Sequence, residues 1–73
     1  MDTVISIKLA RKIRQLRKKH NYTQEELAEL SGVDYKHIQL LESSKPPAAK
    51  IDTIEKIAKA FKITPSELLK FKK

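Results

Sequence analysis

The 73-residue sequence predicts an all-α fold of five short helices in one small domain, residues 1–73. The chain has one glycine and three prolines, and little of it alternates polar and apolar residues as a strand would. Apolar residues instead recur three and four positions apart, the repeat of one helix face. Residues 23–26 and 64–67 also have the capping-box pattern that marks a helix start.

The first helix is expected to occupy the basic segment before Asn21. Its buried stripe should consist of apolar residues at spacings of four, four and three, namely Ile5, Leu9, Ile13 and Leu16. Most basic residues of this segment lie off that stripe. Asn21 can adopt the left-handed conformation that ends a helix, so the first helix should stop there.

The second helix is expected to begin at the capping box of Thr23 and Glu26 and to end at Ser31-Gly32. Leu27 and Leu30, three positions apart, should point inward. Three acidic side chains near the start of this helix suit the positive end of its dipole. The pattern therefore predicts a short helix with one buried face.

The third helix should start almost at once, with Asp34 as its N-cap and Ile38 and Leu41 as its inward stripe. Pro46-Pro47 forbids its continuation.

The fourth and fifth helices differ in how clearly they begin. The fourth has an apolar stripe but a poor N-cap, because only Ala49 and Lys50 precede it. Its stripe comprises Ile51, Ile54, Ile57, Ala58 and Phe61. The fifth starts at the Thr64 capping box, with Pro65 at its first position.

The join between the second and third helices is about three residues long and contains the only glycine, Gly32. So tight a reversal requires a positive φ, which glycine adopts freely and other residues adopt at a cost of roughly 1 kcal/mol. Ala28 fits the same constraint, because helices that meet at a tight turn need a small residue where they approach. Residues 23–43 thus have the arrangement of a helix-turn-helix, whose second helix enters the major groove of DNA.

The net charge of +7 favours a polyanionic partner, with nucleic acid ahead of an anionic membrane. Seven basic residues and one acid give residues 1–22 a charge of +6, and eight basic residues and three acids give residues 44–73 a charge of +5. Residues 23–43 hold five acids and one lysine, which sum to −4. The positive charge therefore flanks the helix-turn-helix.

Several classes of protein are disfavoured. The chain has no cysteine, which excludes disulfides and thiolate zinc sites. His20 and His37 have no metal-ligand spacing, and no nucleophile motif or phosphate-binding glycine loop is present. We therefore expect no enzyme activity, cofactor or metal. No segment approaches a membrane span and no signal peptide is visible, which predicts a cytoplasmic protein.

Three stretches of the chain resemble the phage-repressor and Cro-like (XRE-like) helix-turn-helix family: IRQLRKKHNYTQEELAELSGVD, the positions Ile38, Leu41 and Glu42, and KIDTIEKIAKAFKITPSELL. The resemblance runs from about Arg11 to Phe71 and implies a compact, lambda-repressor-like domain of five helices. It also implies a homodimer that binds double-stranded DNA at a palindromic operator. The chain departs from the family at two places. It has Ser43-Ser44 where relatives often have glycine, and Lys62 where they often have glycine or asparagine.

The resemblance implies which residues meet DNA. Base edges should be read by the exposed positions of the third helix, which are Tyr35, Lys36, Gln39 and Leu40. Lysine would donate to guanine, glutamine would bind adenine, and leucine would contact a thymine methyl group. Phosphates should be bound at the start of the second helix and after the third, by Gln24, Ser43, Ser44, Lys45 and Lys50. The alternative for these residues is an ordinary solvated surface.

Two structural expectations complete the interpretation. The resemblance implies that Arg17 pairs with Glu42 through bidentate hydrogen bonds and so holds the third helix against the first. Leu69 and Phe71 offer more apolar surface than one core stripe needs, so we expect them in a dimer interface. Their alternative role is to close the monomer's own core.

Two classes of function stay open at this point. The first is a minimal transcriptional regulator, such as a phage repressor, a Cro-like protein or a restriction-modification controller. The second is a module that binds another protein, such as the antitoxin partner of a toxin. A basic membrane-binding helix is disfavoured, because the remaining helices form a globular core.

Overall fold

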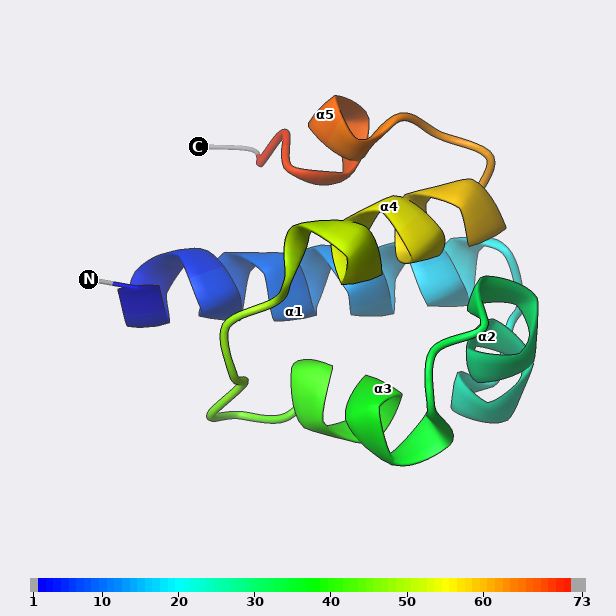
Figure 1. The fold of residues 1–73 in the computed structure, drawn as a ribbon, viewed down its shortest axis with the longest axis horizontal. Coiled ribbons are helices and arrows are strands. Elements are labelled where there is room, and N and C mark those ends of the chain that lie inside the picture. Colours follow the sequence, from blue (N-terminus) through cyan, green and yellow to red (C-terminus); the bar gives the residue numbers. More distant parts are fainter. Residues whose placement is uncertain (1, 72–73) are drawn as a thin grey trace.

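The computed structural model describes residues 2–71, and within this range it contains five helices and no strand (Figure 1). The helices are α1 (Asp2–Lys19), α2 (Gln24–Ser31), α3 (Tyr35–Leu41), α4 (Ile51–Ala60) and α5 (Pro65–Leu68). The predicted all-α fold with a helix-turn-helix in α2 and α3 is confirmed. No helix in the described part of the chain is long and apolar enough to cross a membrane.

The other helices are arranged around α1, which spans the length of the molecule in Figure 1. There α4 and α5 lie above α1, α2 lies at its C-terminal end, and α3 lies below it. Contacts join α2 to α3 and α4, and join α5 to α4 and α1. All of the helices contribute to one buried cluster, made of Leu9, Ile13, Leu27, Val33, Ile38, Leu41, Ile57, Ala58, Phe61 and Leu68.

Both predicted capping boxes are formed. The Thr23 hydroxyl accepts from the Glu26 N–H at 3.0 Å, and the Thr23 N–H donates to Glu26 Oε1 at 2.8 Å. Thr64 and Glu67 make the same pair of bonds at 3.2 and 2.9 Å. The hydrogen bond from the Thr64 backbone lowers the pKa of Glu67, so this carboxylate stays ionised to a lower pH than that of a free glutamate.

Three turns require a positive φ, and three different residues supply it. Asn21 and Gly32 have φ values of 59° and 77°, as the sequence predicts. Lys62, after α4, has a φ of 60°. A lysine in this conformation costs about 1–2 kcal/mol, whereas a glycine does not carry this cost. The loop after α4 therefore has a left-handed turn at a residue less suited to it than glycine.

Three apolar residues that we expected to point inward are exposed instead. Ile5 lies near the N-terminus of α1, and Ile51 is the first residue of α4 and is 86% exposed. Leu30 is exposed because the buried face of α2 runs from Leu27 to Ser31, four positions on. The buried Ser31 hydroxyl accepts from the Val33 N–H at 3.2 Å and so gives this backbone amide of the turn a hydrogen-bond partner.

The start of α3 differs from expectation in its cap, whereas its end lies within the predicted motif of residues 23–43. Asp34 is at the N-cap position, but its side chain makes no capping hydrogen bond. At the other end the helix stops at Leu41, before Pro46-Pro47, so the prolines are not what ends it. Glu42 is the C-cap of the helix.

Candidate nucleic-acid interface

The turn between α2 and α3 is set by backbone conformation. The Gly32 N–H donates to the Ala28 carbonyl at 2.9 Å and closes α2. A Cβ atom built at Gly32 would meet no other atom within 4 Å, so space does not require a glycine here. Its left-handed φ does, because L-residues rarely adopt it. The turn therefore directs α3 away from α2 at a defined angle.

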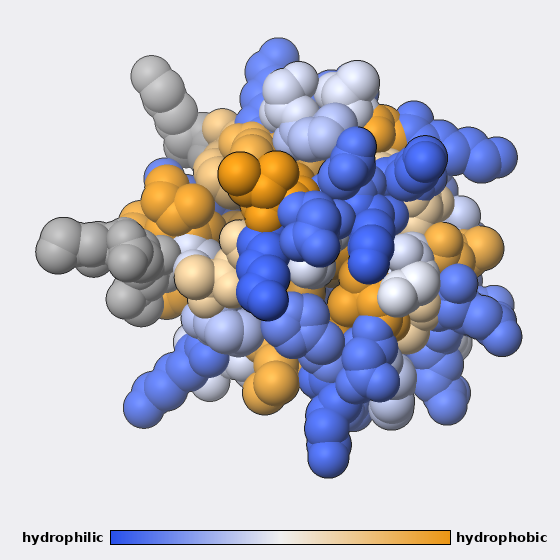
Figure 2. Space-filling view, viewed as in Figure 1, coloured by the Kyte–Doolittle hydropathy of each residue, from blue (hydrophilic) through white to orange (hydrophobic). Residues whose placement is uncertain are grey.

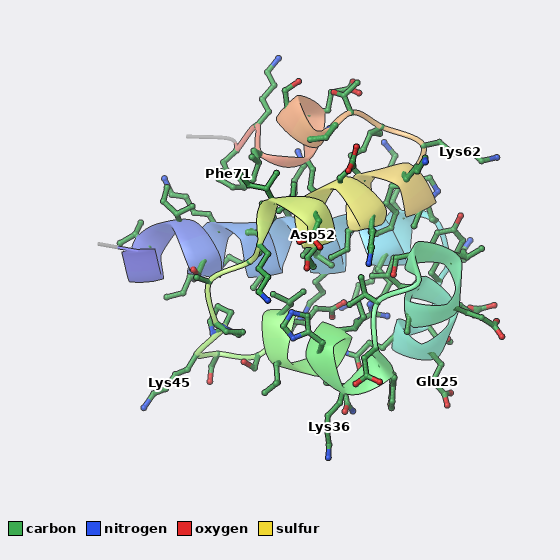
Figure 3. All side chains as sticks on the ribbon, in the orientation of Figure 1. Glu25, Lys36, Lys45, Asp52, Lys62 and Phe71 are labelled. Carbon is green, nitrogen blue, oxygen red and sulfur yellow. The ribbon has the colours of Figure 1, made fainter. Side chains whose placement is uncertain are left out.

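One face of α3 is buried and the opposite face is open to solvent. Ile38 and Leu41 belong to the core, as predicted. The residues expected to read bases, Tyr35, Lys36, Gln39 and Leu40, are all exposed, with Tyr35 at 41% and Leu40 at 50%. Figure 3 shows Lys36 extending from α3 away from the rest of the molecule. The structure thus brings these four side chains together on one projecting surface, which we call the reading face.

Two residues of the reading face are joined to each other. Gln39 Nε2 donates to the Tyr35 hydroxyl at 3.2 Å, one helical turn away. The bond leaves Gln39 Oε1 and its second amide hydrogen available, which are the groups needed to bind an adenine edge. Sequence reasoning missed this bond, although the spacing of four residues would have permitted it.

The C-terminal end of α3 is held by a buried carboxylate. Glu42 is only 3% exposed, and it forms the expected pair with Arg17. Arg17 Nε lies 2.8 Å from Glu42 Oε2, and Nη2 lies 3.0 Å from Oε1. Arg17 also donates through Nη1 to the Tyr22 carbonyl at 3.0 Å. Arg17 therefore ties α1 to the end of α3 through an ion pair and to the residue before the helix-turn-helix through a hydrogen bond.

Gln24 and Arg14 complete this network. Gln24 Nε2, at the start of α2, donates to Glu42 Oε1 at 3.2 Å. Gln24 thus has a structural role beside its predicted phosphate contact, and it keeps a second amide hydrogen and its side-chain oxygen. Arg14 Nη2 donates to the Glu42 backbone carbonyl at 2.9 Å. Sequence reasoning missed Arg14; its position three residues before Arg17 is the signal that could have found it.

The segment after α3 carries the other predicted phosphate contacts. The Ser43 hydroxyl donates to the Leu40 carbonyl at 2.6 Å, so it closes the helix. Ser44 and Lys45 are exposed next to it, and Lys45 extends into solvent (Figure 3). Lys50 is exposed at the far end of this loop, at the N-cap of α4. Along the chain, Ser43, Ser44 and Lys45 are therefore nearer to the reading face than Lys50 is.

The histidines have no arrangement that suggests chemistry. His20 stacks on Tyr22, with ring centroids 5.2 Å apart, and lies tilted against Phe61, with ring centroids 5.3 Å apart. His20 thus packs against aromatic side chains. Within residues 4–71, no three acidic or histidine side chains lie close enough together to hold a metal ion.

Comparison with known proteins adds two findings. The model of a helix-turn-helix family matches residues 13–68. Among solved structures, the chain is similar to the restriction-modification controller protein C.AhdI from Aeromonas hydrophila, with 33% sequence identity and a TM-score of 0.79. That match covers 86% of this chain and 94% of the controller. A search of curated proteins found no match.

Proposed function

The chain belongs to the phage-repressor and Cro-like helix-turn-helix family, and we propose that it acts as a homodimer on a palindromic operator. Its family and its structural neighbour support a DNA-binding transcription regulator, a role that requires no enzymatic activity. The similarity to a restriction-modification controller along most of both chains supports a role of that type. Such a regulator would work in the cytoplasm, in contact with the DNA.

The observation that carries the proposal is the reading face. Its side chains match the chemistry of base edges in the major groove: Lys36 donates to guanine, Gln39 binds adenine, and Leu40 contacts a thymine methyl group. Tyr35 orients Gln39 through the hydrogen bond between them. Ile38 and Leu41 hold the opposite side of α3 in the core, so the reading face keeps its position when it meets DNA.

Phosphate contacts on both sides of α3 would set its register in the groove. Gln24 offers its free amide hydrogen at the start of α2, where the first backbone amides have no partner within the helix. Ser44 and Lys45 offer a hydroxyl and a charge after the end of α3, next to Ser43, and Lys50 offers a second charge at the far end of the loop. Contacts of this kind position a protein on the duplex without reading its sequence.

A dimer would supply the second reading face that a palindromic operator requires. A twofold axis would place two copies of α3 about 34 Å apart, one turn of DNA. Leu69 is 39% exposed and lines a shallow cleft of about 250 Å³. The other lining residues are mostly apolar: Ile5, Ser6, Leu9, Ala48, Ala49 and Ile54. Figure 2 shows apolar side chains gathered beside the chain ends, and we propose this surface as the dimer interface.

Phe71 would contribute less exposed surface to this interface than Leu69. It is half-buried against the core of its own chain, where it also lies beside Lys8 and Lys12 of α1. The exposed edge of the Phe71 ring would extend the proposed dimer interface beyond Leu69 and Ile5.

Selecting bound sites from a random duplex library at two salt concentrations tests the proposed function. We expect a palindromic preference with half-sites about one turn apart and an affinity that falls steeply with salt. Sites without any shared sequence would overturn the proposal of specific recognition.

The interface is tested by Leu69→Asp, with Leu30→Asp as a matched control, since Leu30 is an exposed leucine of α2. Sedimentation should show a concentration-dependent dimer for the parent protein and for Leu30→Asp, and a monomer for Leu69→Asp. A parent protein that stays monomeric at high concentration would exclude the dimer.

A further inference from the structure

We infer that a cleft between α1 and the C-terminal end of α3 binds a phosphate of the DNA backbone through Arg11 and Arg14. This inference rests on the proposed binding of DNA but not on the dimer. The cleft has a volume of about 310 Å³, and its walls are Ile7, Ala10, Arg11, Arg14, Glu42, Ser43 and Ser44. Neither arginine belongs to the reading face or to the phosphate contacts expected from the sequence.

The position of Arg14 is defined by one hydrogen bond that leaves most of its guanidinium free. Its Nη2 donates to the Glu42 carbonyl at 2.9 Å, yet the side chain stays 54% exposed. The remaining guanidinium donors can bind an oxyanion in the bidentate manner typical of arginine and phosphate. Because the guanidinium is already oriented, it loses less conformational freedom when it binds.

The charge balance of the cleft favours an anion. The Glu42 carboxylate is one wall, and Arg14 Nε lies 3.8 Å from its Oε1. That carboxylate is already neutralised by the bidentate pair with Arg17. Arg14 is thus not needed as the counter-ion of Glu42, and together with Arg11 it leaves the cleft positive.

Arg11 and Ser44 provide further donors around the same space. Arg11 is exposed, lies three residues before Arg14 on α1, and forms no hydrogen bond or ion pair with the described residues. Ser44 is exposed on the opposite wall, in the segment that directly follows α3. The cleft therefore combines two guanidinium groups with a hydroxyl.

The place of the cleft fits a strand of the duplex. A helix that occupies the major groove is flanked by sugar-phosphate strands, and the protein grips them on either side. Ser43 and Ser44 join the end of α3 to this cleft, so a strand that passes the end of α3 reaches the two arginines. The phosphate would be held between α1 and the loop rather than on an open surface.

The test measures DNA affinity across a range of salt concentrations for Arg11→Gln and Arg14→Gln. The matched control is Lys62→Gln, because Figure 3 places Lys62 on the side of the molecule opposite Lys36. The probes are the selected operator and an unrelated duplex. Each arginine variant should weaken binding to both duplexes by a similar factor and reduce the slope of log affinity against log salt by about 1. The Lys62 variant should keep the parent slope.

Folding is monitored by thermal unfolding, because Arg14 also holds the Glu42 carbonyl. Arg11→Gln removes no hydrogen bond within the described chain, so it tests the cleft even if Arg14→Gln unfolds. Slopes equal to that of Lys62→Gln would overturn the inference, while salt-dependent binding by the parent protein would leave the proposed function intact. Loss of parent binding would instead refute the proposed function itself.

A further arm separates the DNA backbone from a free anion. Unfolding is compared in inorganic phosphate and in chloride at equal ionic strength. If phosphate protects the parent but not Arg11→Gln, and the DNA slopes are unchanged, the cleft takes a free anion and the inference is wrong.

Discussion

The two ends of α3 differ in how they are held. At the C-terminal end, Glu42 is buried, its carboxylate accepts from Arg17 and Gln24, and its carbonyl accepts from Arg14. At the N-terminal end, Asp34 is exposed and its side chain makes no capping bond. The C-terminal end of α3 is therefore fixed by side-chain hydrogen bonds, whereas its N-terminal end has no side-chain cap.

This difference separates the attachment of α3 to the rest of the protein from its recognition of bases. The side chains that hold α3 are not those that would read a base, so stability and recognition should respond to different substitutions. The expectations below test that separation, starting with the largest effect.

Arg17→Ala should remove about 3–5 kcal/mol from the free energy of unfolding, because it leaves the buried Glu42 carboxylate without its main partner. A loss of this size is comparable to the whole stability of a small domain. Urea or thermal unfolding measures it, with Lys18→Ala as the control on the same helix. Unchanged stability with a selective loss of DNA binding would reverse our assignment of Arg17.

Gln39→Ala should leave unfolding within about 0.5 kcal/mol of the parent value, because Gln39 is exposed. The free energy of binding to the selected operator should become less favourable by about 1–3 kcal/mol. Tyr35→Phe, which removes only the hydroxyl that accepts from Gln39, should have a smaller effect of the same kind. Binding measurements on the operator and on an unrelated duplex decide this, since an equal loss on both would indicate a phosphate contact instead.

Gly32→Ala should destabilise the protein by about 1–2 kcal/mol. The cause is the φ of 77°, because the added methyl group meets no neighbouring atom. Gly32→Asn should cost less, since asparagine tolerates this conformation better. Equal costs for the two variants, measured by urea unfolding, would argue against a purely conformational origin.

The free end of α3 can be compared directly with the start of α2. Thr23→Ala should cost about 1 kcal/mol, because it removes the hydroxyl that accepts from the Glu26 amide. Asp34→Ala should cost only a few tenths of that, because its side chain makes no such bond. If the two variants lose the same stability in thermal unfolding, Asp34 caps α3 in solution and the two ends are more alike than they appear here.

Local sequence patterns were sufficient for most of the fold. The capping boxes of Thr23 and Thr64 and the left-handed turns at Asn21 and Gly32 depend on residues close together in the chain. For this reason their geometry could be expected without knowing the rest of the structure. The exposed character of the reading face followed from the same helical repeat, since Ile38 and Leu41 define the opposite side.

What could not be predicted depends on neighbours distant in sequence. Periodicity shows that Ile5 shares a face with Leu9, but not how far other helices extend along that face. The bonds from Arg14 and Gln24 to Glu42 likewise join residues 28 and 18 positions apart. Whether such side chains meet depends on the crossing of α1, α2 and α3, which no short pattern encodes.

The shared carboxylate of Glu42 has a consequence for how the molecule could be controlled. Because α1 and α2 both bind it, α3 cannot detach alone without stranding an ion in the interior, so docking of this helix and folding should form one all-or-none event. A protein built in this way has little use for a graded change of shape. Its cellular activity would instead follow how many copies are synthesised and how quickly they are degraded.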